Sequence, residues 1–169
     1  MHKQVKQFCK SVKHRFPLYF SNTDVLDCGS MDINGNNRYL FDHCRYTGID
    51  IASGKNVDIV TPVHLFKPNH LYGVVISTEM FEHDVHYLKS LRNMFNLTIS
   101  CGLLLITSAG VDRPEHGTFQ HHPADSPLTP HYYRNVTVEM LLQALDLNQF
   151  SWYELSYCNT DIRFAGIKR

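Results

Sequence analysis

The sequence lacks the features that mark membrane and secreted proteins. No apolar run reaches the ~20 residues of a membrane span, and no secretory signal is visible at the N-terminus. The five cysteines are widely spaced and form no Cys-x-x-Cys pair, so we expect buried free thiols in a reducing compartment. These absences predict a cytoplasmic protein without membrane contact.

An excess of either charge is also missing. Lys and Arg number 16, as do Asp and Glu, whereas a dedicated nucleic-acid binder normally carries a basic excess. Residues 1–23 hold five basic and no acidic side chains, and we interpret this segment as an N-terminal basic amphipathic helix with a solvated face. A basic arm for an anionic partner such as RNA is the alternative, which we do not favour.

The chain is long and apolar enough for one folded domain. It has 169 residues, of which 43% are hydrophobic and 19% charged, as in globular proteins. No internal repeat, low-complexity tract or linker divides it. We therefore expect a single domain over 1–169.

Hydrophobic periodicity predicts alternating strands and helices. Strands are expected at 24–28, 46–51, 57–60, 71–77, 103–107, 150–155 and 161–168. Helices are expected at 3–16, 35–44, 84–95 and 136–147, the last capped near Thr137. This alternation implies a parallel α/β sheet with right-handed crossovers, while the short link at 156–160 permits an antiparallel hairpin at the end.

The segment at 110–135 has no periodicity but carries four prolines and four histidines. A connection of this length inside a domain usually has a functional role, and we interpret it as a candidate substrate lid. A polar surface loop is one alternative. A divalent-metal site is another, made by His116, His121, His122, Asp125 and His131; because their spacing matches no compact zinc motif, we assign no metal ligand.

Polar residues follow several of the expected strands at their carboxyl ends, where open α/β sheets bind ligands. The first strand offers Asp27, Gly29 and Ser30, and glycine lets a ligand approach the backbone. Asp50 ends the second strand, and its two oxygens can accept hydrogen bonds from both hydroxyls of a ribose. A surface carboxylate at Asp50 and a turn cap at Asp27 are the alternatives.

The turn after the first strand has no Gly-x-Gly-x-x-Gly motif, which argues against a nicotinamide or flavin diphosphate. A diphosphate would also be repelled by Asp27. A cofactor with a cationic centre, an amino group and a ribose fits better, and S-adenosylmethionine has all three.

Several motifs resemble class I S-adenosylmethionine-dependent methyltransferases, in the family order. They are Val-Leu-Asp-Cys-Gly-Ser at 25–30, Gly-Ile-Asp at 48–50, Val-Val-Ile-Ser-Thr-Glu-Met-Phe-Glu-His at 74–83, Gly-Leu-Leu-Leu-Ile-Thr-Ser-Ala-Gly at 102–110 and Tyr-Arg-Asn-Val-Thr-Val-Glu-Met-Leu at 133–141. The resemblance implies a Rossmann-like, seven-stranded, mostly parallel sheet of order 3-2-1-4-5-7-6, with strand seven antiparallel and helices on both faces.

The resemblance also implies roles for the residues at the strand ends. Asp27 and Gly29 would contact the methionine moiety of the cofactor, Asp50 its ribose and residues 61–63 its adenine. The full set of expected cofactor-binding residues is Asp27, Gly29, Ser30, Asp50, Ile51, Thr61, Val63, Ser77 and Thr78. The sequence departs from the family at Met31, where a glycine is usual, and the next glycine comes only at Gly35.

The sequence thus predicts methyl transfer to an unidentified acceptor, with a small molecule favoured. A general base is needed only if the acceptor loses a proton, and the candidates are His83, Glu79 and His116. The alternatives are a non-catalytic partner subunit that binds S-adenosylmethionine and, less favoured, another α/β nucleotide-dependent enzyme such as a reductase. The oligomeric state is not indicated.

Overall fold

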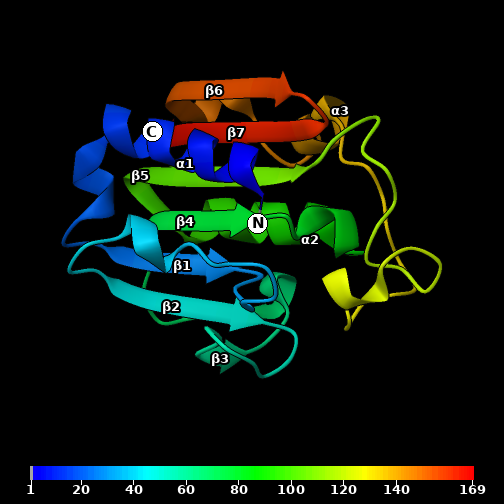
Figure 1. Cartoon of the computed structure of the whole chain (residues 1–169). Helices are drawn as coiled ribbons and strands as arrows, with labels where there is room; N and C mark the ends of the chain where they lie inside the picture. The colour runs from blue at the N-terminus through cyan, green and yellow to red at the C-terminus, as the bar shows by residue number, and fades with distance from the viewer. Residues whose placement is uncertain (1) are drawn as a thin grey trace.

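The computed structural model describes residues 2–169, which form one seven-stranded sheet of order β3-β2-β1-β4-β5-β7-β6 (Figure 1). Neighbouring strands are parallel except around β7, which pairs antiparallel with both β5 and β6. The expected order and hairpin are confirmed. The strands are β1 Asp24–Cys28, β2 Arg45–Asp50, β3 Ile59–Val60, β4 Tyr72–Thr78, β5 Thr98–Ala109, β6 Phe150–Cys158 and β7 Asp161–Lys168.

Helices cover both faces of the sheet, as expected (Figure 1). The basic helix α1 (Lys3–Arg15) buries Val5, Phe8 and Val12 on one face. The opposite face is covered by α2 (Tyr87–Leu97) and α3 (Val138–Leu142). Short 3-10 turns complete the elements: η1 Pro17–Phe20, η2 Arg38–Leu40, η3 Val63–Leu65, η4 Phe81–His83, η5 Pro123–Asp125 and η6 Leu147–Gln149.

The central strands are apolar because side chains from both of their faces are buried. Successive residues of β1 alternate between the two cores: Val25 packs with α1, and Leu26 packs with α2. The carboxyl ends of β1, β2 and β4 therefore meet at one edge of a rigid sheet.

The prediction of a helix at 35–44 is wrong. Only the 3-10 turn η2 forms there, because side chains compete for the backbone groups that a helix would use. Asp32 accepts hydrogen bonds from the Gly35 amide and the Asn36 side chain, both at 2.8 Å, and Asn36 accepts from the Arg38 amide at 3.0 Å.

Several expected boundaries also differ. The strand β5 begins at Thr98, five residues before the expected position, and α2 begins at Tyr87 and ends at Leu97 rather than spanning 84–95. The expected cap of the final helix is confirmed, since Thr137 accepts a hydrogen bond from the Met140 amide at 3.3 Å, but the helix runs from Val138 to Leu142 rather than over 136–147.

The cysteines are all unpaired, but only two of them are buried. Cys9 and Cys28 lie in the core, Cys44 is partly exposed, and Cys101 and Cys158 are exposed. The expectation of buried thiols is therefore wrong for Cys101 and Cys158. Over residues 2–169, no helix has the length and apolar character needed to cross a membrane.

Candidate active site

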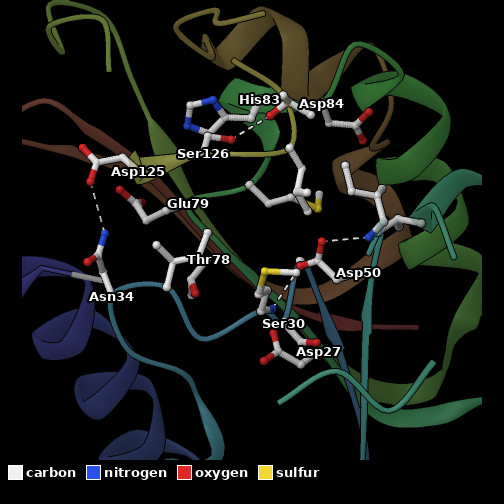
Figure 2. A pocket seen from close by; sticks show the side chains of 18 of the residues that line it. Asp27, Ser30, Asn34, Asp50, Thr78, Glu79, His83, Asp84, Asp125 and Ser126 are labelled. Atoms are coloured by element: carbon white, nitrogen blue, oxygen red, sulfur yellow. Dashed lines mark hydrogen bonds between the residues drawn. The ribbon is translucent and has the colours of Figure 1, made fainter. Parts of the chain in front are cut away.

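A cavity of about 710 Å³ lies at the carboxyl ends of β1, β2 and β4 (Figure 2). Its size is within the usual range for sites that bind small molecules. Eleven of the twelve residues expected at the site line it: Asp27, Gly29, Ser30, Asp50, Ile51, Thr61, Val63, Thr78, Glu79, His83 and His116. The twelfth, Ser77, is fully buried in the sheet, and the structure places it outside the lining.

The carboxyl group of Asp27 lies at the floor of the cavity and is only 1% exposed. Its oxygens accept hydrogen bonds from the Tyr46 hydroxyl at 2.5 Å and from the Asn37 side chain at 3.2 Å. Burial disfavours the charged form and raises the pKa of Asp27 to about 6, although both hydrogen bonds oppose this shift. The carboxyl is ionised at neutral pH, so it gives the floor a negative charge.

The turn after β1 is tight at Gly29, whose φ of +76° favours glycine. The amides of Gly29 and Ser30 both donate to the Ile49 carbonyl at 3.0 Å, which ties the turn to β2. Met31, where the family has a glycine, packs against Gly54. A Cβ on Gly54 would lie 3.0 Å from the Met31 Cε. The loop after β2 thus makes room for the larger side chain.

Asp50 ends β2 beside this turn (Figure 2). One oxygen accepts from the Met31 amide at 3.0 Å and the other from the Ile51 amide at 2.7 Å. Burial raises the pKa of Asp50, and the two amides oppose that shift. A carboxylate has about four acceptor positions, so Asp50 can still accept hydrogen bonds from a vicinal diol in the cavity.

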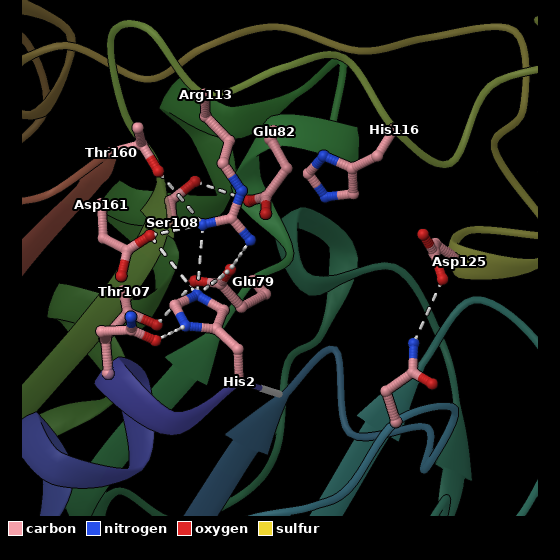
Figure 3. A network of polar contacts seen from close by, with 12 residues as sticks. His2, Glu79, Glu82, Thr107, Ser108, Arg113, His116, Asp125, Thr160 and Asp161 are labelled. Atoms are coloured by element: carbon pink, nitrogen blue, oxygen red, sulfur yellow. Dashed lines mark hydrogen bonds and ion pairs between the residues drawn. The ribbon is translucent and has the colours of Figure 1, made fainter. Parts of the chain in front are cut away.

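Glu79 follows β4 with a left-handed φ of +57° and lies in a network of charges (Figure 3). Its carboxylate is 3.2 Å from His2 Nε2 and 3.6 Å from Arg113. Both cations also contact Asp161, Arg113 at 2.6 Å and His2 at 3.4 Å. These carboxylates raise the pKa of His2 to about 10, so the network joins the start of α1 to the cavity wall through charged pairs.

The other two base candidates, His83 and His116, lie together. Their ring centroids are 5.2 Å apart, and the Tyr133 ring packs against both, at 5.6 Å and 5.0 Å respectively. Burial and the neighbouring His116 lower the pKa of His83 to about 4. The His83 imidazole is therefore neutral at physiological pH, with a lone pair available as a proton acceptor or a ligand.

Part of the segment expected as a lid forms a wall of the cavity, through residues between 113 and 129. It is tied to the site by hydrogen bonds from the Arg134 amide to the Glu82 carbonyl at 2.8 Å and from Asn34 to Asp125 at 3.3 Å. Among the described residues, groups with metal-binding spacing are Glu82–His83–His116 and His2–Glu79–Asp161. The five residues of the loop considered as a metal site are not gathered by the structure.

The lining also contains residues that were not expected at the site from the sequence, among them His2, Asn37, Met80 and Arg113. His2 and Arg113 are in contact although 111 positions separate them. Asn37 lies where a helix was expected. Only Met80 could have been expected from the sequence, because it stands within the motif at 74–83 that follows an expected strand.

Solved structures show what fold this is. The N1-methyltransferase for 1,6-didemethyltoxoflavin from Burkholderia thailandensis, bound to that compound and S-adenosylhomocysteine, matches with a TM-score of 0.69 at 14% identity over 97% of this chain and 78% of that chain. The N-methyltransferase NodS from Bradyrhizobium japonicum gives a TM-score of 0.59 at 13% identity over 98% and 97%. The N-terminal domain of EvdMO1, solved with S-adenosylhomocysteine and D-fucose, gives 0.67 at 15% over 99% and 84%.

No protein-family model matches the sequence, and no curated protein matches it. At such low identities the likeness to solved structures establishes the fold. The resemblance seen in the sequence is confirmed at that level: the chain has the fold of class I S-adenosylmethionine-dependent methyltransferases.

Proposed function

We propose that this protein binds S-adenosylmethionine and transfers its methyl group to a small-molecule acceptor. The observation that carries the proposal is the pair of carboxylates, Asp27 and Asp50, on either side of the Gly29 turn at the floor of a ligand-sized cavity. In two of the similar structures S-adenosylhomocysteine, the demethylated cofactor, is bound.

The residues present fit this cofactor. Gly29 lines the cavity at the turn, and Asp27 supplies negative charge suited to an ammonium or sulfonium group. Asp50 keeps acceptor capacity for the ribose hydroxyls, and Thr61 and Val63 line the cavity beyond it, where the adenine would lie. The cofactor supplies an electrophilic methyl group on a sulfonium.

The protein's own contribution is to hold and orient the reactants. Methyl transfer requires an in-line arrangement and the exclusion of water. Residues between 113 and 129 form one wall of the cavity, which suits both tasks. His83, in η4 beside that wall, lines the cavity and is one of the three candidate bases, with Glu79 and His116, for an acceptor that must lose a proton.

A small acceptor suits the volume of the cavity. The cavity of about 710 Å³ must hold both the cofactor and the acceptor, which leaves no room for a buried macromolecule. The acceptor of the Burkholderia enzyme is 1,6-didemethyltoxoflavin, a small molecule. Formal net charge is zero, which gives the chain no general affinity for polyanions.

Calorimetric titration with S-adenosylmethionine, S-adenosylhomocysteine and NAD(H) tests the cofactor. We expect the first two to bind and the third not to. In Asp50→Ala, affinity should fall by about 1–3 kcal/mol, because a charge-assisted hydrogen bond to the cofactor is lost. The matched control is Asp42→Ala, whose exposed carboxylate pairs with Lys13; its affinity should be unchanged. Exclusive binding of NAD(H) would refute the proposal.

Incubation with cofactor carrying a labelled methyl group and fractionated cell extract tests catalysis. Transfer of label to a small-molecule fraction supports the enzyme. Binding of S-adenosylhomocysteine without transfer to any fraction favours the alternative of a non-catalytic partner subunit. Transfer mainly to RNA would contradict the choice of acceptor class.

A further inference from the structure

We propose that Glu82, His83 and His116 form a binding site for one divalent transition-metal ion in the wall of the cavity. One candidate ligand atom from each residue lies within 4.8 Å of the others. Glu82 and His83 belong to η4, directly after β4, whereas His116 comes from the segment after β5. Figure 3 shows the Glu82 carboxylate beside the His116 ring.

Two buried polar atoms of this cluster have no partner in the described chain: Oε1 of Glu82 and Nδ1 of His83. Glu82 is 0% exposed. A buried polar atom left without a hydrogen bond costs about 1–3 kcal/mol, and native proteins rarely keep one without a reason. Protonation does not remove the cost for Glu82, because Oε1 would then be a donor without an acceptor. A cation would satisfy both atoms.

The hydrogen bonds around the cluster leave one coordinating atom on each residue. Ser108 donates to Glu82 Oε2 at 2.6 Å, which leaves Oε1. Nδ1 of His116 lies 3.1 Å from the Pro114 carbonyl and donates to it, and in the neutral ring the lone pair is then on Nε2. Nδ1 of His83 has no partner among the described residues, which leaves it as a candidate ligand atom. Such outer contacts fix the tautomer of metal-binding histidines.

The donor set selects the class of ion. Two imidazoles and one carboxylate suit the divalent ions from Mn²⁺ to Zn²⁺, whereas Mg²⁺ and Ca²⁺ prefer oxygen ligands. Burial and the nearby Glu79 raise the pKa of Glu82, so binding would displace a proton from this carboxyl group. His83 is already neutral and needs no deprotonation.

The second group with metal-binding spacing, His2, Glu79 and Asp161, does not share these properties. Arg113 lies within it, 2.6 Å from Asp161, and supplies the positive charge. His2 itself is a cation there, since its pKa is raised to about 10. The carboxylates of this group are therefore neutralised by His2 and Arg113 and need no metal ion. This difference leaves Glu82, His83 and His116 as the candidate metal site.

The position of the cluster indicates a role in holding the acceptor, a step that rests on the proposed function. His83 and His116 line the cavity, whereas Glu82 lies behind them. Three protein ligands leave coordination positions open on the cavity side. An acceptor with an oxygen donor, such as a hydroxyl or a carboxylate, could occupy one of them.

Titration of metal-free protein with Co²⁺ tests the site, because the intensity of the cobalt absorption bands reports coordination. The protein is first treated with a chelator, and neither cofactor nor acceptor is present. We expect one equivalent of Co²⁺ to bind, Zn²⁺ to displace it and Mg²⁺ to fail to do so. His116→Ala and Glu82→Gln should each weaken binding at least tenfold.

The matched control is His121→Ala, since this exposed histidine lies five positions from His116 and outside the cluster. Its Co²⁺ affinity should equal that of the unchanged protein. Ser108→Ala retains all three ligands but removes the hydrogen bond to Glu82, and a loss of about tenfold is expected for such an outer contact. Circular dichroism establishes that each variant is folded, and the partly exposed His116 is the substitution least disruptive to the core.

The proposal is overturned if folded, metal-free protein binds no stoichiometric Co²⁺, or if His116→Ala binds as tightly as the unchanged protein. Equal losses in His121→Ala and His116→Ala would also overturn it. Because these measurements need no cofactor, they are independent of the proposed function. Stoichiometric binding in a protein without affinity for S-adenosylmethionine would retain the metal site and reject the methyltransferase.

Discussion

Replacement of the buried Asp27 by asparagine should make the protein more stable at neutral pH while it weakens cofactor binding. The side chain is 1% exposed, and its ionised form has lost most of its hydration. Asparagine has nearly the same shape and carries no charge. Its carbonyl oxygen can accept from Tyr46, and rotation of the Asn37 amide would offer the Asn37 oxygen, which has no partner among the described residues, to the new amide.

The pKa of Asp27 gives the size and sign of the effect. The pKa rises from 3.8 to about 6 on folding, and at 1.36 kcal/mol per pH unit this shift corresponds to about 3 kcal/mol. A raised folded pKa means that the native state binds the proton more tightly. The contribution of Asp27 to stability is therefore fully present below about pH 4 and is lost as the pH rises through about 6.

Urea denaturation of both proteins between pH 4 and pH 7.5 measures the effect. The difference in free energy of unfolding, Asp27→Asn minus unchanged protein, should increase across this range by up to about 3 kcal/mol. Calorimetry at pH 7.5 should show weaker binding of S-adenosylmethionine by the same variant. Any constant offset from altered hydrogen bonds does not affect the slope.

Asp24 provides a control of opposite sign on the same strand. It pairs with Arg45, which lowers its pKa, so its stabilising effect is present at neutral pH and lost on acidification. The difference between Asp24→Asn and the unchanged protein should therefore fall as the pH rises. A flat difference for Asp27→Asn, or one that falls like that of Asp24→Asn, would refute the argument from burial.

Two further predictions concern the cavity wall. The pKa of His2 is raised to about 10 by Asp161 and Glu79, so the stabilising effect of His2 is complete below about pH 6.5 and lost towards pH 10. In urea titrations across that range, the difference in free energy of unfolding between the unchanged protein and His2→Gln should shrink. A constant difference would contradict the ion pairs. Gly117→Ala should lower the free energy of unfolding by about 1–3 kcal/mol, because φ of Gly117 is +66° and a Cβ there would lie 2.7 Å from His83 Cε1. Acceptor turnover should fall while cofactor affinity is unchanged. Unchanged turnover and thermal stability would show that the wall tolerates the side chain.

The sheet could be predicted because its signals are local. The expected span of β1 is confirmed residue for residue, since a short apolar run between polar residues has few alternatives. Once the parallel order was expected, the meeting of Asp27 and Asp50 followed, because the carboxyl ends of parallel strands share one edge. The failure at 35–44 has the opposite origin: Asp32 and Asn36 offer the backbone local partners that a periodicity argument does not weigh.

The wall of the cavity could not be predicted in the same way. Glu82 and His116 are separated by a full strand, a helix and part of a loop rich in proline. Where that loop runs depends on tertiary contacts such as the bond from Asn135 to the Gly110 carbonyl, and its histidines carry no periodic signal. The sequence therefore indicated that histidines were available, but it indicated neither which of them meet nor that Glu82 lies beside them.

Asp27 and Glu82 are both buried carboxyl groups with raised pKa values, yet they differ in their hydrogen bonding. Both oxygens of Asp27 are hydrogen-bonded, whereas Glu82 keeps one oxygen without a partner in the chain as described. If that oxygen binds a metal, Glu82→Gln should change the stability of metal-free protein little, because Ser108 keeps its acceptor. At Co²⁺ a hundredfold above the dissociation constant, the unchanged protein should then gain about 2.7 kcal/mol. The variant should gain far less, and an equal gain in both proteins would place the ion elsewhere.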